Sequence, residues 1–223
     1  MMFERIAPEQ YDTLDRIPEP SENAFLIGHV QAADALAAAY RAGKLPHALL
    51  FSGPRGIGKA TLAFHFAYHV LTNPDQAAAP ARIAPPDTKS TLFRQIAAGS
   101  HPSVLHLTRP PGDRGGFKSA ITVDEVRKVG RFTSHTAHDG GYRIVIVDPA
   151  DDMNVNAANA LLKNLEEPPA RTVFILIAHQ AGRLLPTIRS RCQAVRFSPL
   201  NADELFAVLE RLQIDLPADA GRS

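Results

Sequence analysis

The sequence contains one cysteine, Cys192, no tryptophan and almost no net charge. A single cysteine excludes an internal disulfide and a cysteine-rich zinc module. The 24 Lys and Arg residues nearly balance the 23 Asp and Glu residues, which excludes the global basic field that drives non-specific DNA binding. No run approaches the roughly 18 apolar residues needed to cross a bilayer, and the first residues carry charges and prolines rather than the apolar core of a secretion signal. We expect a globular protein of the reducing cytoplasm that does not contact a membrane.

The composition and the hydrophobic periodicity predict an α/β fold. Hydrophobic residues make up 45% of the 223 residues, enough for one large domain and a small appendage. Short apolar runs, typical of buried strands, alternate with stretches of helical periodicity. We expect strands within residues 47–53, 103–107, 120–123, 142–148 and 172–178, and helices within residues 30–42, 59–71, 123–135 and 154–167. This alternation predicts a parallel sheet with helices on both faces.

Three other segments predict the domain organisation. Residues 1–22 contain three prolines and predict an extended arm. Residues 73–90 hold four prolines among alanines and predict a mobile insertion rather than packed structure. The amphipathic stretch 203–212 predicts the first helix of a second unit. We therefore divide the chain into a large domain over residues 1–198 and the beginning of a small helical domain over residues 199–223.

The segment GPRGIGKAT, residues 53–61, fits the pattern GxxxxGK and lies between a predicted strand and a predicted helix. Such a loop lets successive backbone N–H groups converge on phosphate oxygens at a helix N-terminus, while the lysine reaches the β- and γ-phosphates of a nucleotide. The candidate phosphate-binding residues are Gly53, Pro54, Gly56, Gly58, Lys59 and Thr61. The alternative is that the glycines only form a tight turn and that Lys59 lies in solvent beside it.

Two positions depart from the pattern of a hydrolysing enzyme. The residue after Lys59 normally offers a hydroxyl to Mg²⁺, but Ala60 has none, and Thr61 lies about 100° further round the helix. The predicted strand YRIVIVD ends in Asp148, a position near the metal, and Pro149 follows in place of a glutamate that could polarise a water. Asp148 could equally be a turn residue at a strand end. Together, Ala60 and Pro149 predict poor or absent ATP hydrolysis.

Four segments together resemble the clamp-loader branch of the AAA+ family in order and spacing. They are GPRGIGKATLAF (residues 53–64), GSHPSVLHL (99–107), NAANALLKNLEEPP (156–169) and LLPTIRSRC (184–192). The resemblance covers about residues 20–215. Within the branch, Ala60 and Pro149 resemble the delta-prime type of DNA polymerase III subunit rather than the gamma/tau motor subunits. The fold that this implies is a P-loop AAA+ domain, then a helical lid, then a helical collar that we expect this chain to stop short of.

The resemblance implies a role in DNA replication, as a rigid subunit of the DNA polymerase III holoenzyme. Its implied partners are gamma/tau and delta clamp-loader subunits, the sliding clamp and, through the complex, primed DNA. In this family the Ser-Arg-Cys motif, here residues 190–192, carries an arginine finger that reaches a neighbour's ATP site, because a planar, permanently charged guanidinium can stabilise the transferring phosphoryl group. Arg191 is the implied finger. The alternatives are a surface arginine and confusion with Arg189, and Cys192 is expected to pack rather than react.

The resemblance also bears on cofactors. ATP or ADP is the implied ligand, held without hydrolysis. Many family members carry four zinc-binding cysteines after the phosphate-loop helix, but residues 73–101 contain none, so we expect no structural zinc and no metal site. The family's sensor of the γ-phosphate falls near His179 or Gln180, which are not the usual Thr or Asn. Gly28 and His29 resemble the segment near the adenine, and a helix N-cap is their alternative interpretation.

Two rival functions stay open at this point. A catalytically active ATPase of the gamma/tau type would replace the missing hydroxyl by Thr61 or by water. A nucleotide-free interaction module would use protein contacts alone. Glu166 and Glu167 could suggest paired catalytic acids, but adjacent helical residues point in different directions, which favours a solvated or interface role.

Overall fold

The computed structural model describes residues 4–134 and 141–214. Within these ranges a five-stranded parallel sheet has the order β2-β3-β4-β1-β5. The strands are β1 (Ala48–Ser52), β2 (Val104–Leu107), β3 (Arg143–Val147), β4 (Thr172–Ala178) and β5 (Gln193–Arg196). Every residue of β4 is buried, and β1 and β3 are nearly so. Their continuous apolar runs follow from this burial, because a strand covered on both faces has no solvent side for polar residues.

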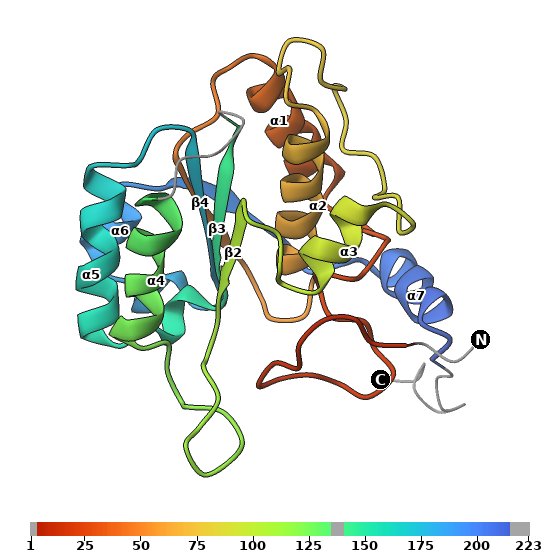
Figure 1. The fold of residues 1–223 in the computed structure, drawn as a ribbon. Helices are drawn as coiled ribbons and strands as arrows, with labels where there is room; N and C mark the ends of the chain where they lie inside the picture. Colours follow the sequence, from red (N-terminus) through yellow and green to blue (C-terminus); the bar gives the residue numbers. More distant parts are fainter. Residues whose placement is uncertain (1–3, 135–140, 215–223) are drawn as a thin grey trace.

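Helices cover both faces of this sheet (Figure 1). They are α1 (Val30–Arg41), α2 (Lys59–Thr72), α3 (Thr91–Ala97), α4 (Val123–Ser134), α5 (Val155–Glu166), α6 (Pro186–Arg189) and α7 (Ala202–Arg211). Helices α1, α2 and α3 lie on one face, and α4, α5 and α6 lie on the other. Alternate residues of each central strand enter different cores: Ile146 and Ile175 pack with α1 and α2, whereas Val145 and Phe174 pack with α4 and α5. The predicted parallel sheet between two helical layers is therefore confirmed.

Local caps account for where several helices begin. The Asn154 side chain accepts a hydrogen bond from the Ala157 N–H at 2.9 Å and starts α5. Asn201 and Glu204 form a reciprocal capping box at the start of α7. Such side chains satisfy N–H groups that have no partner within the helix. The helix expected over residues 154–167 ends at Glu166, and two prolines follow Glu167.

The stretch expected to be extended over residues 120–123 forms only an isolated bridge, between Ile121 and Met153. In the described ranges, two short α-helices and one short strand were missing from the prediction. They are α3, α6 and β5, of seven, four and four residues. Strand β5 has the sequence QAVR and is largely exposed, so it lacks the apolar run that marks a strand. It forms because its backbone pairs with β1 along Leu49–Ser52, a contact that local sequence does not encode.

The prediction that residues 73–90 form an unpacked insertion is wrong, because the segment packs against the domain. The segment has no regular helix or strand, as its prolines indicate. Nevertheless Ala79 is only 1% exposed and belongs to the core beside α1 and α2. The Gln76 amide donates to the carbonyl O of Tyr40 at 3.1 Å and to the Tyr142 hydroxyl at 3.0 Å. Tertiary hydrogen bonds and one buried methyl group hold the segment against the domain.

The arm at the N-terminus is a folded loop rather than an extended tail. Arg5 Nη1 donates to the Glu19 carboxylate at 3.0 Å. The buried Glu22 carboxylate accepts the backbone N–H groups of Ile6 at 2.7 Å and Ala7 at 3.0 Å. These bonds join the two ends of the segment, which therefore closes on itself. In Figure 1 the arm, in red, lies beyond the end of the sheet.

Helix α7 follows the sheet as a separate element, and the domain boundary at residue 198 stays a prediction. In the described ranges, 4–134 and 141–214, none of the helices has the length and apolar character required to traverse a membrane.

Candidate functional site

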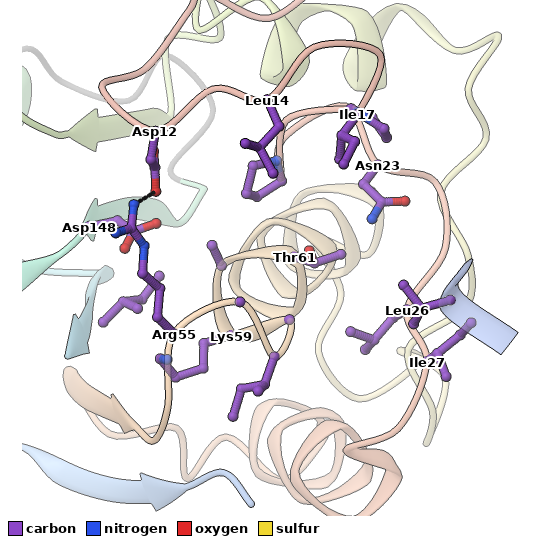
Figure 2. A pocket seen from close by; sticks show the side chains of 18 of the residues that line it. Asp12, Leu14, Ile17, Asn23, Leu26, Ile27, Arg55, Lys59, Thr61 and Asp148 are labelled. Carbon is purple, nitrogen blue, oxygen red and sulfur yellow. Dashed lines mark hydrogen bonds and ion pairs between the residues drawn. The ribbon is translucent and has the colours of Figure 1, made fainter. Parts of the chain in front are cut away.

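Three segments meet at the carboxyl edge of the sheet. Strands β3, β4 and β1 are neighbours and run in the same direction, so the residues that follow them lie side by side. These are Asp148 after β3, His179 after β4 and the phosphate loop, residues 53–58, after β1. They contribute to a pocket of about 1050 Å³ (Figure 2). The carboxyl edge is the usual ligand site of an open parallel sheet.

The pocket has a polar end and an apolar end. Arg55, Lys59 and Asp148 line the polar end together with the backbone of the phosphate loop. Many of the other lining residues are apolar, among them Leu26, Ile27, Leu200, Leu205, Val208 and Leu212, although Thr13 and Asn23 also line the pocket. Helix α7 therefore covers part of the same cavity as the phosphate loop. The arrangement suits a ligand with an anionic group at one end and an apolar or aromatic group at the other.

The glycines of the phosphate loop have different roles. Gly56 has φ +78° and Gly58 has φ +97°, left-handed conformations that glycine adopts without strain. Gly58 is the N-cap of α2, so the positive end of the helix dipole faces the pocket. Gly53 instead allows close packing, because a Cβ there would overlap the carbonyl O of Phe197. Neither Gly53 nor Pro54 lines the main pocket, and Pro54 lines a smaller neighbouring one.

Lys59 is buried rather than solvated beside a turn, with only 3% of its surface exposed. Its ammonium donates to the carbonyl O of Gly53 at 2.8 Å and also to that of Pro54. Burial lowers the pKa of Lys59 to about 8, against the opposing effect of the carboxylates of Asp148 and Asp151. The alternative of a solvated lysine is therefore wrong. The loop holds a buried cation at the polar end of the pocket.

Asp148 lies in the same polar end, and its carboxyl group is unusual. Burial and, secondly, the charge of Asp12 raise the pKa of Asp148 to about 7, while Lys59 opposes them. Thr61 lies on the side of α2 that faces Asn23, and Asp148 lies across the pocket from it (Figure 2). The roles of Thr61 and Asp148 toward a nucleotide stay predictions.

Sequence reasoning missed Asp151, which organises the loop after β4. Its carboxylate accepts the backbone N–H of His179 at 3.1 Å and that of Gln180 at 2.8 Å. His179 lines the pocket, and burial lowers the pKa of its imidazole. Asp151 therefore holds the backbone at His179 and Gln180, the proposed sensor positions, although no sequence motif identifies Asp151. The sensing role itself stays a prediction.

The folded arm contacts the phosphate loop and the residues beside it, and the sequence did not reveal these contacts. Arg55 donates to the Asp12 carboxylate at 2.7 Å. The Arg109 guanidinium lies 4.0 Å from the centre of the Tyr11 ring and donates through Nε to Asp152 at 2.7 Å. Burial, with the charge of Asp12, raises the pKa of Tyr11 to about 12. The arm thus forms one wall of the pocket, which only the tertiary fold could show.

Gly28 and His29 lie at the start of α1. His29 is its N-cap, with φ +57°, and its Nε2–H donates to the carbonyl O of Ile57 at 2.5 Å. A Cβ on Gly28 would lie 2.7 Å from Leu200, so this glycine permits the approach of the segment before α7. The helix-start interpretation is confirmed. Proximity to an adenine stays a prediction.

Arg191 does not belong to this pocket. It follows α6 and forms an ion pair with Glu166, at 2.8 Å, and a hydrogen bond to the carbonyl O of Thr187, at 2.9 Å. A group that acts on a neighbouring subunit must lie outside its own chain's site, and Arg191 meets that condition. The ion pair also gives Glu166 a role at the surface, as the partner of Arg191 rather than as half of a carboxylate pair with Glu167.

The Cys192 thiol is partly buried against the core beside α4 and α5. Burial raises its pKa to about 11, so little thiolate is present near neutral pH. We expect the native protein to react with a disulfide reagent at pH 8 about 100-fold more slowly than the urea-unfolded chain. The reason is that the thiolate is the reactive species, and an unperturbed cysteine has a pKa of about 8.5. Absorbance of the released thiol measures both rates, and equal rates would contradict the packing role.

Comparisons with known proteins agree with this architecture. Residues 28–201 match the family model described as DNA polymerase III, delta subunit. DNA polymerase III subunit delta-prime of Pseudomonas aeruginosa is 42% identical over 174 residues, which cover 78% of this chain and 50% of that protein. The chain belongs to the DNA polymerase III delta-prime family. The delta-prime subunit of Escherichia coli is 35% identical, over 74% of this chain and 46% of that protein.

This delta-prime family member spans about half the length of the curated relatives that it matches. A gamma-subunit-related protein of DNA polymerase III from Thermotoga maritima has a similar fold, with a TM-score of 0.54 and 22% identity over 82% of this chain and 50% of that one. A RuvB variant from the same organism has a TM-score of 0.51 and 16% identity over 86% of this chain and 54% of that one. These likenesses show that the delta-prime family member shares its fold with both proteins.

Among its described residues, no three His, Cys, Asp or Glu side chains are grouped so that they could hold a metal ion. The absence of a structural zinc stays a prediction.

Proposed function

We propose that this chain is the AAA+ part of a delta-prime-type subunit of the DNA polymerase III clamp loader that does not hydrolyse ATP. It acts as a rigid stator in DNA replication. Arg191 is its arginine finger, which completes the ATP site of a neighbouring gamma/tau subunit. The partners are gamma/tau and delta subunits and the sliding clamp, and the complex works on primed DNA in the cytoplasm.

The observation that carries this proposal is a complete phosphate loop whose reactive neighbours are missing. Lys59 is buried at the N-terminus of α2 in a large pocket. Ala60 offers no oxygen to a metal, and Pro149 offers no base to a water. A pocket that keeps its shape but lacks these groups suits a subunit that binds a nucleotide or simply preserves the fold. ATP or ADP is the ligand class that we propose, held without hydrolysis.

The location of Arg191 supports the finger. Its side chain is 35% exposed and is not among the residues that line the pocket of its own chain. A planar guanidinium can donate two parallel hydrogen bonds to phosphoryl oxygens of a neighbour.

The test compares the isolated full-length protein with the complete loader. We expect no Mg²⁺-dependent ATP turnover from the isolated protein, and DNA-stimulated turnover of gamma/tau subunits that requires its addition. Turnover by the isolated protein would instead support the active gamma/tau-type ATPase.

A thermal-shift series separates nucleotide binding from the third possibility, an interaction module without nucleotide. A ligand at about 100 times its dissociation constant stabilises the native protein by about 2.7 kcal/mol. A melting temperature that neither ATP nor ADP raises would support the interaction module.

A further inference from the structure

The backbone of Arg191 is held on both sides by packed elements. Its N–H donates to the carbonyl O of Ile188 at 3.1 Å, and Ile188 is fully buried in the core beside α5. Strand β5 begins two residues later and pairs with β1. The neighbouring Cys192 packs against the same core as Ile188. The remaining freedom of Arg191 therefore lies in the rotations of its long side chain.

Two acceptors restrict those rotations. The Glu166 carboxylate forms an ion pair with Nη2 at 2.8 Å, and the carbonyl O of Thr187 accepts a hydrogen bond from Nη1 at 2.9 Å. Glu166 is the last residue of α5, and its neighbour Leu165 is buried in the same core as Ile188. The carboxylate and the guanidinium are thus carried by elements that share one core. An arginine has five N–H donors in a rigid fork, so the two bonds leave other donors of Arg191 available to a phosphoryl group.

Nearby residues of the same type are not restrained in this way. Arg189 and Glu167 are both exposed, and in the described part of the chain neither side chain has a hydrogen bond or ion pair. Glu167 is adjacent to Glu166 at the end of the same helix. The pairing is therefore specific to Glu166 and Arg191.

We propose that Glu166 is a positioning residue for Arg191, an inference that rests on the proposed role of Arg191 as a finger. It orients the guanidinium without touching the neighbour's nucleotide. A long side chain that is already oriented loses less conformational freedom when it docks. Because exposed ion pairs are weak, we expect a contribution of about threefold to fivefold to the rate at the site that Arg191 serves.

The experiment uses the full-length protein in the reconstituted loader with gamma/tau and delta subunits, clamp and primed DNA. We expect Glu166→Ala to lower the rapid-mix rate of ATP hydrolysis at the site that Arg191 serves about threefold to fivefold, without changing KM. Glu166→Gln, which keeps an acceptor oxygen but no charge, should lie between Glu166→Ala and the unchanged protein. Glu167→Ala, the matched control on the adjacent residue, should have no effect. High salt should reduce the loss, because screening weakens the ion pair in the unchanged protein.

A double-variant cycle distinguishes positioning from a structural role. In an Arg191→Ala loader, Glu166→Ala should cause no further loss. An equal loss with and without Arg191 would overturn the inference, as would a rise in kcat, which would show that Glu166 holds Arg191 back. Full turnover of Glu166→Ala alongside a loss in Arg191→Ala would overturn the positioning role alone. Unchanged turnover in Arg191→Ala would remove the finger, and the positioning role with it.

Discussion

Arg191→Ala in this subunit alone is expected to lower ATP hydrolysis at the neighbouring site that it serves by about 10³-fold, within the range of measured arginine fingers. The guanidinium is positioned outside its own pocket and paired through only part of its fork. Loss of a charge that meets the transferring phosphoryl group removes stabilisation that exists only in the transition state. In a rapid-mix measurement on the full-length loader with clamp and primed DNA, the initial burst of ATP hydrolysis should lose the part that one site contributes.

Arg189→Ala is the matched control. It removes an arginine two residues away whose side chain has no ion pair within the described ranges, and we expect full turnover. Arg191→Lys keeps the charge but loses the planar fork, so it should also be severely impaired. Size-exclusion chromatography checks that each loader assembles. An intact complex with unchanged burst and steady-state rates in Arg191→Ala would leave this subunit with a scaffolding role only.

Asp148→Asn is expected to raise the free energy of unfolding of the full-length protein at pH 8, by about 2 kcal/mol. The pKa of Asp148 is raised from the ordinary 3.8 to about 7, mainly by burial and secondly by Asp12. A carboxyl group with a raised folded-state pKa binds protons more tightly in the native state, so its ionisation destabilises that state. Three pKa units correspond to about 4 kcal/mol, and we halve this because the site is open to solvent on one side.

The direction of the Asp148 pKa shift fixes how the free energy of unfolding depends on pH. In the unchanged protein the contribution of Asp148 to stability falls as pH rises from about 4 to about 7 and is constant above that range. The neutral amide of the variant does not titrate. The difference between the two proteins should therefore be largest at pH 8 and shrink toward pH 5. Thermal and urea unfolding between these pH values measure it, and about 2 kcal/mol corresponds to a change in Tm of roughly 4–8 °C.

Asp15→Asn supplies the control for the charge change. Its carboxylate is 97% exposed in the same arm that carries Asp12, so we expect no pH-dependent difference. Asp12→Asn should move the pH midpoint of the Asp148 effect downward, because it removes the second cause of the raised pKa. A gain from Asp148→Asn that is the same at pH 5 and pH 8 would contradict a raised pKa.

Much of the fold could be predicted from local patterns. The strand Thr172–Ala178 has the predicted bounds, and the strand predicted at 142–148 is one residue shorter at each end. Continuous apolar runs have few alternatives when helices cover both faces of a sheet. The elements that were missed are short, and β5 also lacks an apolar run. The arm and residues 73–90 were misread because prolines forbid helices and strands but do not forbid packing.

The sequence by itself determined four of the five strands, the phosphate loop and the groups that the loop lacks. Apolar periodicity and the glycine pattern are local properties, and Ala60 and Pro149 have no chemistry to offer in any fold. Only the tertiary structure decided what surrounds these groups. The contacts of Asp12 with Arg55, of Asp151 with the loop after β4, and of Glu166 with Arg191 join residues 25 or more positions apart. Such contacts, and the pKa of a half-buried carboxyl like Asp148, depend on three-dimensional burial and distance, which no local pattern carries.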